Sequence, residues 1–184
     1  MQALGFWLRH ASDDDLPGLR DLYADTRAEE VAGVPWPAMA KRSFLDHQFE
    51  LQHRHYLAHY ADAEFLVIEE GDRLQGRYYL QRRPGADLIV DISLVAACRG
   101  RGVGRALIEA TQREAAGGGR GMTLHVVRNN AAARRLYERL GFRAEGPVFD
   151  EVGIPHVRMT LGITGQDGIE AGHRGHEEHP LDAR

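Results

Sequence analysis

Hydrophobic positions recur along this chain with two different periods, and each period predicts one type of element. Gly5 to His10 alternates between apolar and polar residues, which predicts a strand. Apolar residues then recur three and four positions apart, which predicts a helix whose buried face carries Leu16, Leu19, Leu22 and Tyr23. The prolines within Val34–Pro37 end this stretch, and a second, longer helix is expected from Ala38 to about His59.

The rest of the chain predicts shorter elements. Strands are expected at Phe65–Glu69, Arg77–Arg82, Leu88–Val95, Met122–Val127, Phe142–Val148 and Val157–Leu161, and helices at Ala106–Ala116 and Asn130–Leu140. The resulting order, β-α-α-β-β-β-α-β-α-β-β, predicts an α/β fold with a mixed central sheet. We expect a single domain over residues 1–163. Residues 164–184 are polar and rich in glycine and histidine, which predicts a flexible tail.

Composition narrows the class of protein. The 184 residues are 43% hydrophobic and 27% charged, which is typical of one soluble globular domain. No apolar run approaches the ~20 residues of a membrane span, and Met1–His10 lacks the features of a signal peptide. The single cysteine, Cys98, excludes an internal disulfide framework and favours the cytoplasm. A net charge of −4 argues against nucleic-acid binding.

An apolar strand leads directly into a glycine-rich turn and then into a predicted helix. The turn holds three glycines and three arginines, namely Arg99, Gly100, Arg101, Gly102, Gly104 and Arg105. The first N–H groups of a helix have no intrahelical acceptor, and glycine lets a ligand approach the main chain because it has no Cβ. The helix dipole and the arginines both favour negative charge. This segment therefore predicts a site for a phosphorylated ligand.

Three glycine motifs compete to describe this turn, and a tight turn without a ligand is the further alternative. A P-loop requires Lys-Ser or Lys-Thr, which the chain lacks. The dinucleotide motif requires Gly-x-Gly-x-x-Gly, whereas Gly104 comes one position early. The third pattern, Arg/Gln-x-x-Gly-x-Gly/Ala after a central strand, is met by Arg99, Gly102 and Gly104. It resembles the pyrophosphate loop of the GNAT superfamily of acyl-CoA-dependent N-acetyltransferases.

A second motif resembles the same superfamily. Asn130 to Phe142 follows the pattern Asn-x-x-Ala-x-x-Leu-Tyr-x-x-x-Gly-Phe at the expected distance from the turn. The close resemblance covers residues 87–161, and it implies a GNAT-like sheet in which two parallel strands splay apart to hold acetyl-CoA. The cofactor-binding residues that it implies are Ile92, Ser93, Leu94, Arg99, Gly100, Arg101, Gly102, Val103, Gly104, Arg105, Asn130 and Ala133.

The resemblance also implies a role for the main chain of the motif-bearing strand. Ile92, Ser93 and Leu94 are expected to pair with the pantetheine arm, and a free N–H at Leu94 is expected to polarise the thioester carbonyl. The alternative is an ordinary central strand with every amide paired. Asn130 is expected to cap the following helix, and its side chain is also placed to hydrogen-bond the pantetheine.

Two residues are candidates for proton transfer. Tyr137 stands where the superfamily often places its general acid, and a phenol with a pKa of ~10 can protonate a thiolate whose thiol has a pKa of ~8.5. Its spacing also fits the buried face of a helix. His125 stands where some members carry a glutamate base, and a neutral imidazole can accept the proton of an ammonium group. A purely structural histidine is an equal alternative.

Several other polar residues have two interpretations. Asp91 is either a substrate-side carboxylate or a hydrogen-bonded core group, and the second is favoured. Glu151 and His156 lie on a predicted hairpin beside the acceptor site and are candidates for substrate contact. His55 and His59 have the i, i+4 spacing of a metal pair, but the sequence places no third ligand beside them. No metal is therefore expected.

The function that follows is that of an acyltransferase of the EC 2.3.1 type, which moves an acetyl group from acetyl-CoA to a primary amine by direct attack. Residues 24–60 are expected to form the acceptor wall, with a small-molecule acceptor favoured over a protein. The alternatives are a non-catalytic acyl-CoA-binding or sensing module and, disfavoured by the glycine spacing, a nicotinamide-dinucleotide enzyme. We expect no nucleic-acid or membrane partner and either a monomer or a homodimer.

Overall fold

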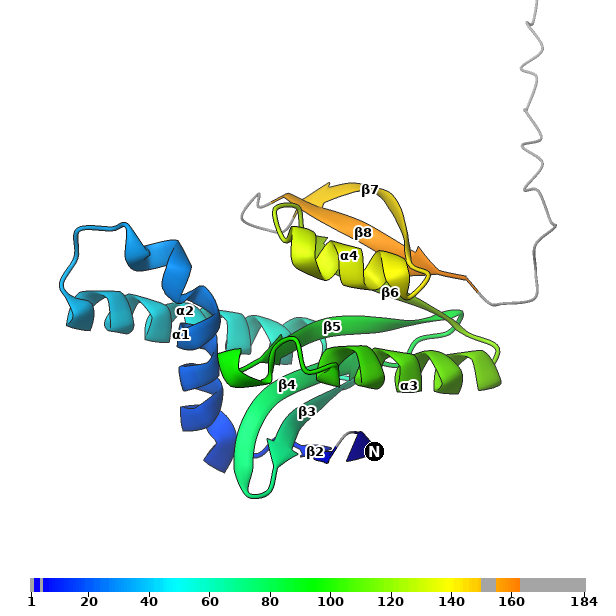
Figure 1. Cartoon of the computed structure of the whole chain (residues 1–184), viewed down its shortest axis with the longest axis horizontal. Helices are drawn as coiled ribbons and strands as arrows, with labels where there is room; N and C mark the ends of the chain where they lie inside the picture. Colours follow the sequence, from blue (N-terminus) through cyan, green and yellow to red (C-terminus); the bar gives the residue numbers. More distant parts are fainter. Residues whose placement is uncertain (1, 4, 150–154, 163–184) are drawn as a thin grey trace, which may run out of the picture.

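A single eight-stranded sheet organises the computed structural model, which describes residues 2–3, 5–149 and 155–162 (Figure 1). The strands are β1 Gln2–Ala3, β2 Phe6–His10, β3 Ala63–Glu70, β4 Arg73–Gln81, β5 Ala86–Leu94, β6 Gly121–Val127, β7 Arg143–Phe149 and β8 Pro155–Leu161. Their order in the sheet is β1-β2-β3-β4-β5-β6-β8-β7. Within the described residues β5 and β6 form the parallel pair, and the other neighbouring strands are antiparallel.

In the described part of the chain, four helices cover the two faces of this sheet. They are α1 Leu16–Ala32, α2 Ala38–His59, α3 Val103–Gly117 and α4 Ala131–Arg139, with short 3₁₀ turns at Asp13–Asp15 and Ala96–Cys98. Strand alternation separates two cores, because Leu66 and Ile68 pack with the residues of α3 and α4 whereas Val67 packs with those of α1 and α2. No helix in the described ranges is long and apolar enough to cross a membrane.

The predicted fold class is confirmed, with small differences in the elements. The mixed α/β sheet follows the predicted order, with the two-residue strand β1 added before it. Helix α3 begins at Val103 rather than at Ala106, because Gly102 takes a left-handed conformation (φ 83°) and serves as its N-cap. The predicted tail, residues 164–184, lies outside the described residues.

The sheet opens between β5 and β6. Their parallel pairing covers only four residue pairs and ends at Ile89 opposite Leu124. At the same level the β4–β5 register shifts, since Tyr79 faces Asp91 while Leu80 faces Ile89, and Val90 is the extra residue of a bulge. A bulge bends its strand and increases the local twist, so β5 turns away from β6 beyond this point. Figure 1 shows the two strands diverging between α3 and α4, which confirms the predicted splay.

Candidate active site

The unpaired edge of β5 presents main-chain groups to this opening. The Val95 N–H donates to the Gln75 carbonyl at 2.9 Å, which identifies a hydrogen-bonded pair of the β4–β5 ladder. Because such pairs alternate in antiparallel sheets, the amides of Asp91 and Ser93 face β4 and those of Ile92 and Leu94 face the opposite edge. That edge has no pairing strand among the described residues beyond Ile89. Ser93 thus departs from the expectation that its main chain faces the pantetheine.

The glycine turn follows this edge directly and ends at the N-terminus of α3. Gly100 and Gly102 have φ values of 74° and 83°, which only glycine adopts without strain. The first helical hydrogen bond runs from the Ala106 N–H to the Gly102 carbonyl, and no side chain caps the helix. The preceding N–H groups, from Gly102 to Arg105, therefore lack intrahelical acceptors and favour an anion at this end.

The surroundings of Gly104 and of the three arginines could not be predicted from the sequence. A Cβ on Gly104 would lie 3.6 Å from the Ile92 side chain, which is ordinary contact, so packing alone does not require glycine there. Each arginine already has a carboxylate partner at 2.8–2.9 Å: Arg99 binds Asp25, Arg101 binds Glu70 and Arg105 binds Glu109. The main-chain amides, unlike these arginines, have no partner that a ligand would have to displace.

Helix α4 carries the candidate acid. Asn130 is its N-cap, as predicted, since its Oδ1 accepts a hydrogen bond from the Ala133 N–H at 3.0 Å. Tyr137 is buried beside Phe142, and its hydroxyl has no hydrogen-bond partner within the described part of the chain. Burial, with a smaller effect from the negative charge of Asp91, raises the pKa of Tyr137 to about 12. The gap from a thiol pKa of ~8.5 is thus wider than an ordinary phenol would give.

His125 lies on the other face of the sheet from Tyr137. Leu124 and Val126 are buried in the core that contains Tyr137, so the intervening His125 points away from it and is exposed. It stands opposite Arg158 of β8. Partial desolvation by neighbouring residues lowers the pKa of His125, and the positive charges of Arg158, His156 and Arg83 lower it further. The lowered pKa favours the neutral imidazole, which is the form that can accept a proton.

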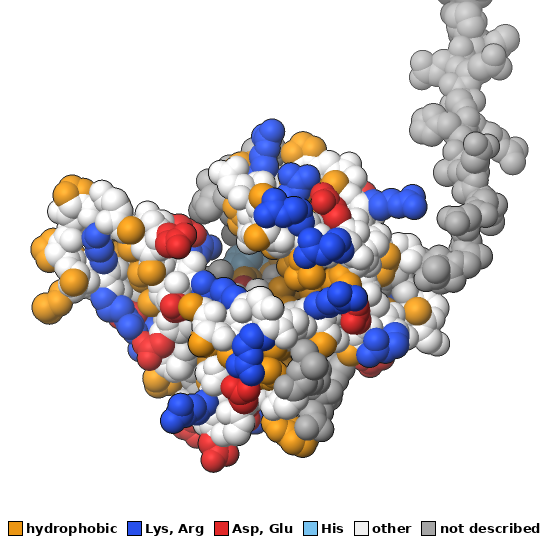
Figure 2. Space-filling view, viewed as in Figure 1, with side chains coloured by type: hydrophobic (Ala, Val, Ile, Leu, Met, Phe, Trp, Pro, Cys, Tyr) orange, Lys and Arg blue, Asp and Glu red, His pale blue; other side chains and the backbone are white. Residues whose placement is uncertain are grey.

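Helix α2 faces the same side of the sheet as His125. Tyr56 donates to the Asp91 carboxylate at 2.8 Å and contacts the ring of Tyr79. Asp91 is thus a hydrogen-bonded group, as favoured by the sequence. Figure 2 shows the surface hollowed between α3 and α4, with a histidine side chain at the floor of the hollow.

The remaining candidates do not extend this site. His55 and His59 stack on each other at 4.2 Å, and the described ranges contain no group of three potential metal ligands. Cys98 is buried, and its thiol donates to the Gln75 side chain at 3.2 Å. His156 pairs in register with Val127 at the end of β6. Glu151 lies outside the described residues.

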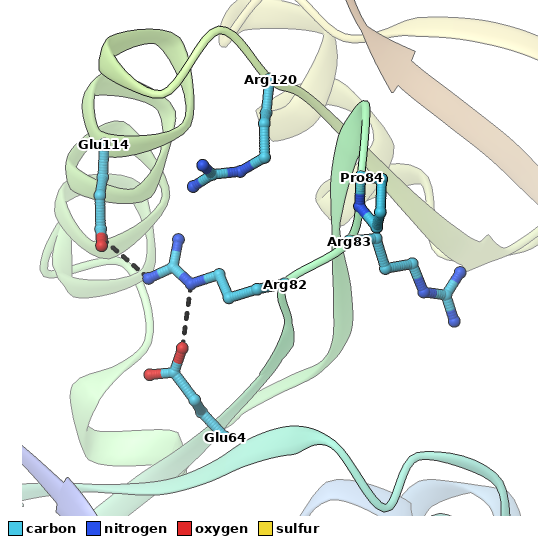
Figure 3. Close-up of a pocket in the computed structure, with 6 residues that line it drawn as sticks. All are labelled: Glu64, Arg82, Arg83, Pro84, Glu114 and Arg120. Atoms are coloured by element: carbon cyan, nitrogen blue, oxygen red, sulfur yellow. Dashed lines mark hydrogen bonds and ion pairs between the residues drawn. The ribbon is translucent and has the colours of Figure 1, made fainter.

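A second hollow lies at the other end of β5, where the sequence predicted nothing. It has a volume of about 550 Å³ and is lined by Glu64, Arg82, Arg83, Pro84, Glu114 and Arg120 (Figure 3). Beside it the fully buried carboxylate of Asp87 accepts hydrogen bonds from Arg82 at 2.9 Å and from Arg120 at 2.8 Å. Arg82 also binds Glu64 and Glu114. These guanidinium groups are therefore satisfied by the protein itself.

Taken together, the opened parallel pair and the uncapped helix behind it define an α/β protein with a free strand edge that leads to a helix N-terminus favourable to an anion. Comparison with known families identifies the class further. The acetyltransferase (GNAT) domain matches residues 24–163, and the chain belongs to this family.

Individual relatives agree with this family. A mycothiol acetyltransferase from Brachybacterium faecium is 31% identical over 143 residues, which are 71% of this chain and 43% of the relative, so the chain spans less than half of that protein's length. A PaiA N-acetyltransferase from Thermoplasma acidophilum, solved with coenzyme A, has a TM-score of 0.59 at 18% identity, covering 84% of this chain and 98% of its own. The ribosomal-protein-S18-alanine N-acetyltransferase from Escherichia coli has a TM-score of 0.57 at 20% identity, covering 94% and 99%.

Proposed function

We propose that this protein is an N-acetyltransferase that transfers an acetyl group from acetyl-CoA to a primary amine by direct attack. The observation that carries the proposal is the continuity between the free Ile92 and Leu94 amides and the uncapped N-terminus of α3. A pantetheine arm carries amide groups that can pair with a strand edge, and its pyrophosphate suits a helix N-terminus. The PaiA N-acetyltransferase that was solved with coenzyme A shares this fold, which supports the choice of donor.

Besides the bound acyl-CoA, the reaction requires an oxyanion donor, a base and an acid, and the residues present fit each role. The amine nitrogen attacks the thioester carbonyl carbon, a C–N bond forms, and the C–S bond breaks. The Leu94 N–H, which faces the opening, is the donor that we assign to the developing oxyanion. His125 accepts the proton that the amine loses, directly or through water, and Tyr137 supplies a proton to the departing thiolate.

The positions of the two proton-transfer groups suit this assignment. Tyr137 on α4 and His125 on β6 lie on opposite faces of the sheet, so proton removal from the amine and proton delivery to the thiolate are separated. The acceptor then approaches on the face covered by α2, and the thiol departs on the face covered by α4. We propose a cytoplasmic location, since the single buried cysteine, Cys98, suits a reducing compartment.

The second candidate is a non-catalytic acyl-CoA-binding or sensing module. It is favoured by one observation, the raised pKa of Tyr137, which makes this phenol a weaker acid for a thiolate. Such a module needs the strand edge and the glycine turn but not Tyr137. Turnover in the wild-type protein decides between the two.

Two measurements test the proposal in sequence. Thermal unfolding with acetyl-CoA, CoA and NAD identifies the ligand, because a ligand at ~100 times its Kd stabilises the fold by ~2.7 kcal/mol. Release of CoA thiol is then followed with a panel of tyramine, histamine, L-glutamate and a peptide that begins with alanine. Stabilisation by both CoA species but not by NAD, with thiol release for at least one amine, supports the enzyme. Stabilisation without turnover supports the binding module, and no stabilisation overturns both.

A further inference from the structure

A saturated carboxylate lies at the opening, on the acceptor side of the sheet. The Oδ1 atom of Asp91 accepts hydrogen bonds from Arg77 Nε at 3.2 Å and from Ser93 Oγ at 2.8 Å, and Oδ2 accepts from Arg77 Nη2 and from the Tyr56 hydroxyl, both at 2.8 Å. A carboxylate offers about four lone-pair sites, and all four are occupied. Asp91 therefore has no capacity left to receive a substrate ammonium or to take its proton.

The partners of Asp91 come from separate elements of the fold. Arg77 belongs to β4, and its guanidinium lies 5.7 Å from the ring centre of Tyr56 and 5.2 Å from that of Tyr79. It also donates to the side-chain oxygen of Gln52 at 2.6 Å. Gln52 and Tyr56 are one turn apart on α2. The network thus attaches one face of α2 to β4 and to β5.

The place of this attachment relates it to the cofactor edge. Asp91 directly follows the bulge at Val90, where the pairing with β6 has just ended, and it precedes the free amide of Ile92. Arg77 is only 3% exposed, so the ion pair is shielded from water and holds its geometry more firmly than a surface pair. The network therefore joins the helix that covers the acceptor face to the strand that presents the thioester.

We propose that Asp91, held by Arg77 and Tyr56, is a positioning residue that sets helix α2 at the correct distance from the β5 edge and thereby places the acceptor amine. This inference rests on the proposed acetyl transfer. It assigns no proton transfer to Asp91, because its lone pairs are filled. The network acts on the acceptor through α2, whereas the cofactor contacts the other side of β5 and the α3 turn.

The variants Tyr56→Phe and Asp91→Asn test this separation. Tyr56→Phe keeps the ring that packs on Arg77 and Tyr79 but removes one bond to the carboxylate, and Asp91→Asn removes the charge. We expect the KM for the best amine of the panel to rise at least fivefold in Tyr56→Phe and further in Asp91→Asn. The Kd for acetyl-CoA, measured by calorimetry, should change less than twofold in both.

The matched control is Tyr78→Phe. Tyr78 follows Arg77 on β4, but its hydroxyl hydrogen-bonds Thr111 at 2.8 Å in the core on the other face of the sheet. This variant loses a buried hydroxyl of the same strand and should keep the wild-type KM for the amine. The positioning role is overturned if the amine KM of Tyr56→Phe is unchanged, or if the Kd for acetyl-CoA rises by the same factor as the amine KM. Either result leaves the proposed function intact.

Two further outcomes are distinguishable from these. If Asp91→Asn unfolds at the assay temperature, Tyr56→Phe alone decides, since it retains the ion pair. If the wild-type protein releases no thiol with any amine, the proposed function fails and this inference fails with it.

Discussion

The two ends of β5 each carry an aspartate held by arginine, yet only one end is suited to bind a ligand. At the beginning of the strand, β5 is paired on both sides. There Asp87 accepts hydrogen bonds from Arg82 and Arg120, and Arg82 also binds Glu64 and Glu114. At its end, β5 is no longer paired with β6, and the Ile92 and Leu94 amides face the opening. The aspartate is ion-paired at both ends of β5, whereas main-chain N–H groups without a pairing strand occur, among the described residues, at the end of the strand.

This difference shows how a binding site is to be recognised in such a fold. The hollow at the beginning of β5 is lined by three arginines, but Figure 3 shows Arg82 held by glutamates and Arg83 directed away from it. An anion there would have to displace existing ion pairs. At the opening, an anion meets N–H groups that have no intrahelical acceptor, so nothing has to be broken first. We therefore propose the opening as the cofactor site.

Replacing Tyr137 produces the largest expected effect at the open end. Tyr137→Phe removes the proton that we assign to the departing thiolate, and general acid catalysis typically contributes 10²–10⁴-fold. We expect kcat to fall by about 10²-fold or more, with an unchanged Kd for acetyl-CoA. Steady-state thiol release and calorimetry measure the two quantities.

Tyr78→Phe is the matched control for Tyr137→Phe. Tyr78 lies in the same core, and its hydroxyl hydrogen-bonds Thr111 at 2.8 Å. It has no role in the proposed reaction. It should lower the melting temperature and leave kcat within twofold. Unchanged turnover in Tyr137→Phe would remove this residue from the mechanism.

Valine substitutions at two glycines allow the two ends of β5 to be compared with similar backbone strain in each variant. Gly100 in the turn and Gly85 at the beginning of β5 have φ values of +74° and +80°, and a Cβ at either meets nothing within 4 Å in the protein. Valine at either position should therefore cost similar stability. We expect Gly100→Val to weaken acetyl-CoA binding at least tenfold, because its side chain occupies the approach to the main chain, while Gly85→Val binds normally. Equal Kd values for acetyl-CoA in the two variants would contradict the placement of the cofactor at the glycine turn.

Asp87 provides the stability counterpart at the closed end. Burial alone would raise its pKa, but hydrogen bonds from Arg120 and Arg82 outweigh burial and lower the pKa below 3.8. Removing the charge in Asp87→Asn leaves two guanidinium groups that are 28% and 30% exposed and so partly compensated by water. We expect a loss of about 2 kcal/mol, or a Tm lower by about 4–8 °C, without a change in acetyl-CoA affinity.

The pH dependence of this loss has a definite sign. A carboxyl whose folded-state pKa is lowered stabilises the protein above its unfolded pKa, and this contribution is lost as the pH falls through the folded value. The difference in unfolding free energy between wild type and Asp87→Asn should therefore be full at pH 7 and shrink below about pH 4. Urea unfolding at both pH values measures it, and a difference that grows in acid would exclude the ion pair as its cause.

His125 gives the smallest expected effect, a shift in a pH profile. Its pKa lies below 6.5 because burial and the neighbouring positive charges disfavour the imidazolium. The acidic limb of kcat/KM should consequently fall below pH 6.5 in the wild-type protein and disappear in His125→Gln. A limb that persists in the variant would assign the titration to another group.

The sequence was informative where a local pattern determines local structure. The alternation of apolar residues predicted the strands, the Asn130 cap was recognisable from its position before a helix, and Gly100 and Gly102 do adopt conformations that require glycine. The splay between β5 and β6 followed from resemblance, and the bulge at Val90 is its physical cause. Nothing in the residues around Val90 predicts a bulge, because it depends on pairing with β4.

The side-chain partners were not predictable because they are distant in sequence. Asp91 meets Arg77 from 14 residues away and Tyr56 from 35 residues away. The arginines of the turn were expected to face the phosphates, but Arg99 and Arg101 reach Asp25 and Glu70, which the fold brings beside the turn. The residues around each arginine do not indicate a partner so distant in sequence. Only the tertiary structure therefore shows which charged side chains already form ion pairs.

Amide hydrogen exchange with and without acetyl-CoA tests the central claim most directly, because it compares the two ends of β5 in one experiment. We expect acetyl-CoA to slow exchange over residues 92–105, which contain the free strand edge and the α3 turn, and to leave residues 82–88 unchanged. Protection of residues 82–88 without residues 92–105, or no protection at either end, would contradict the assignment of the cofactor to the opening.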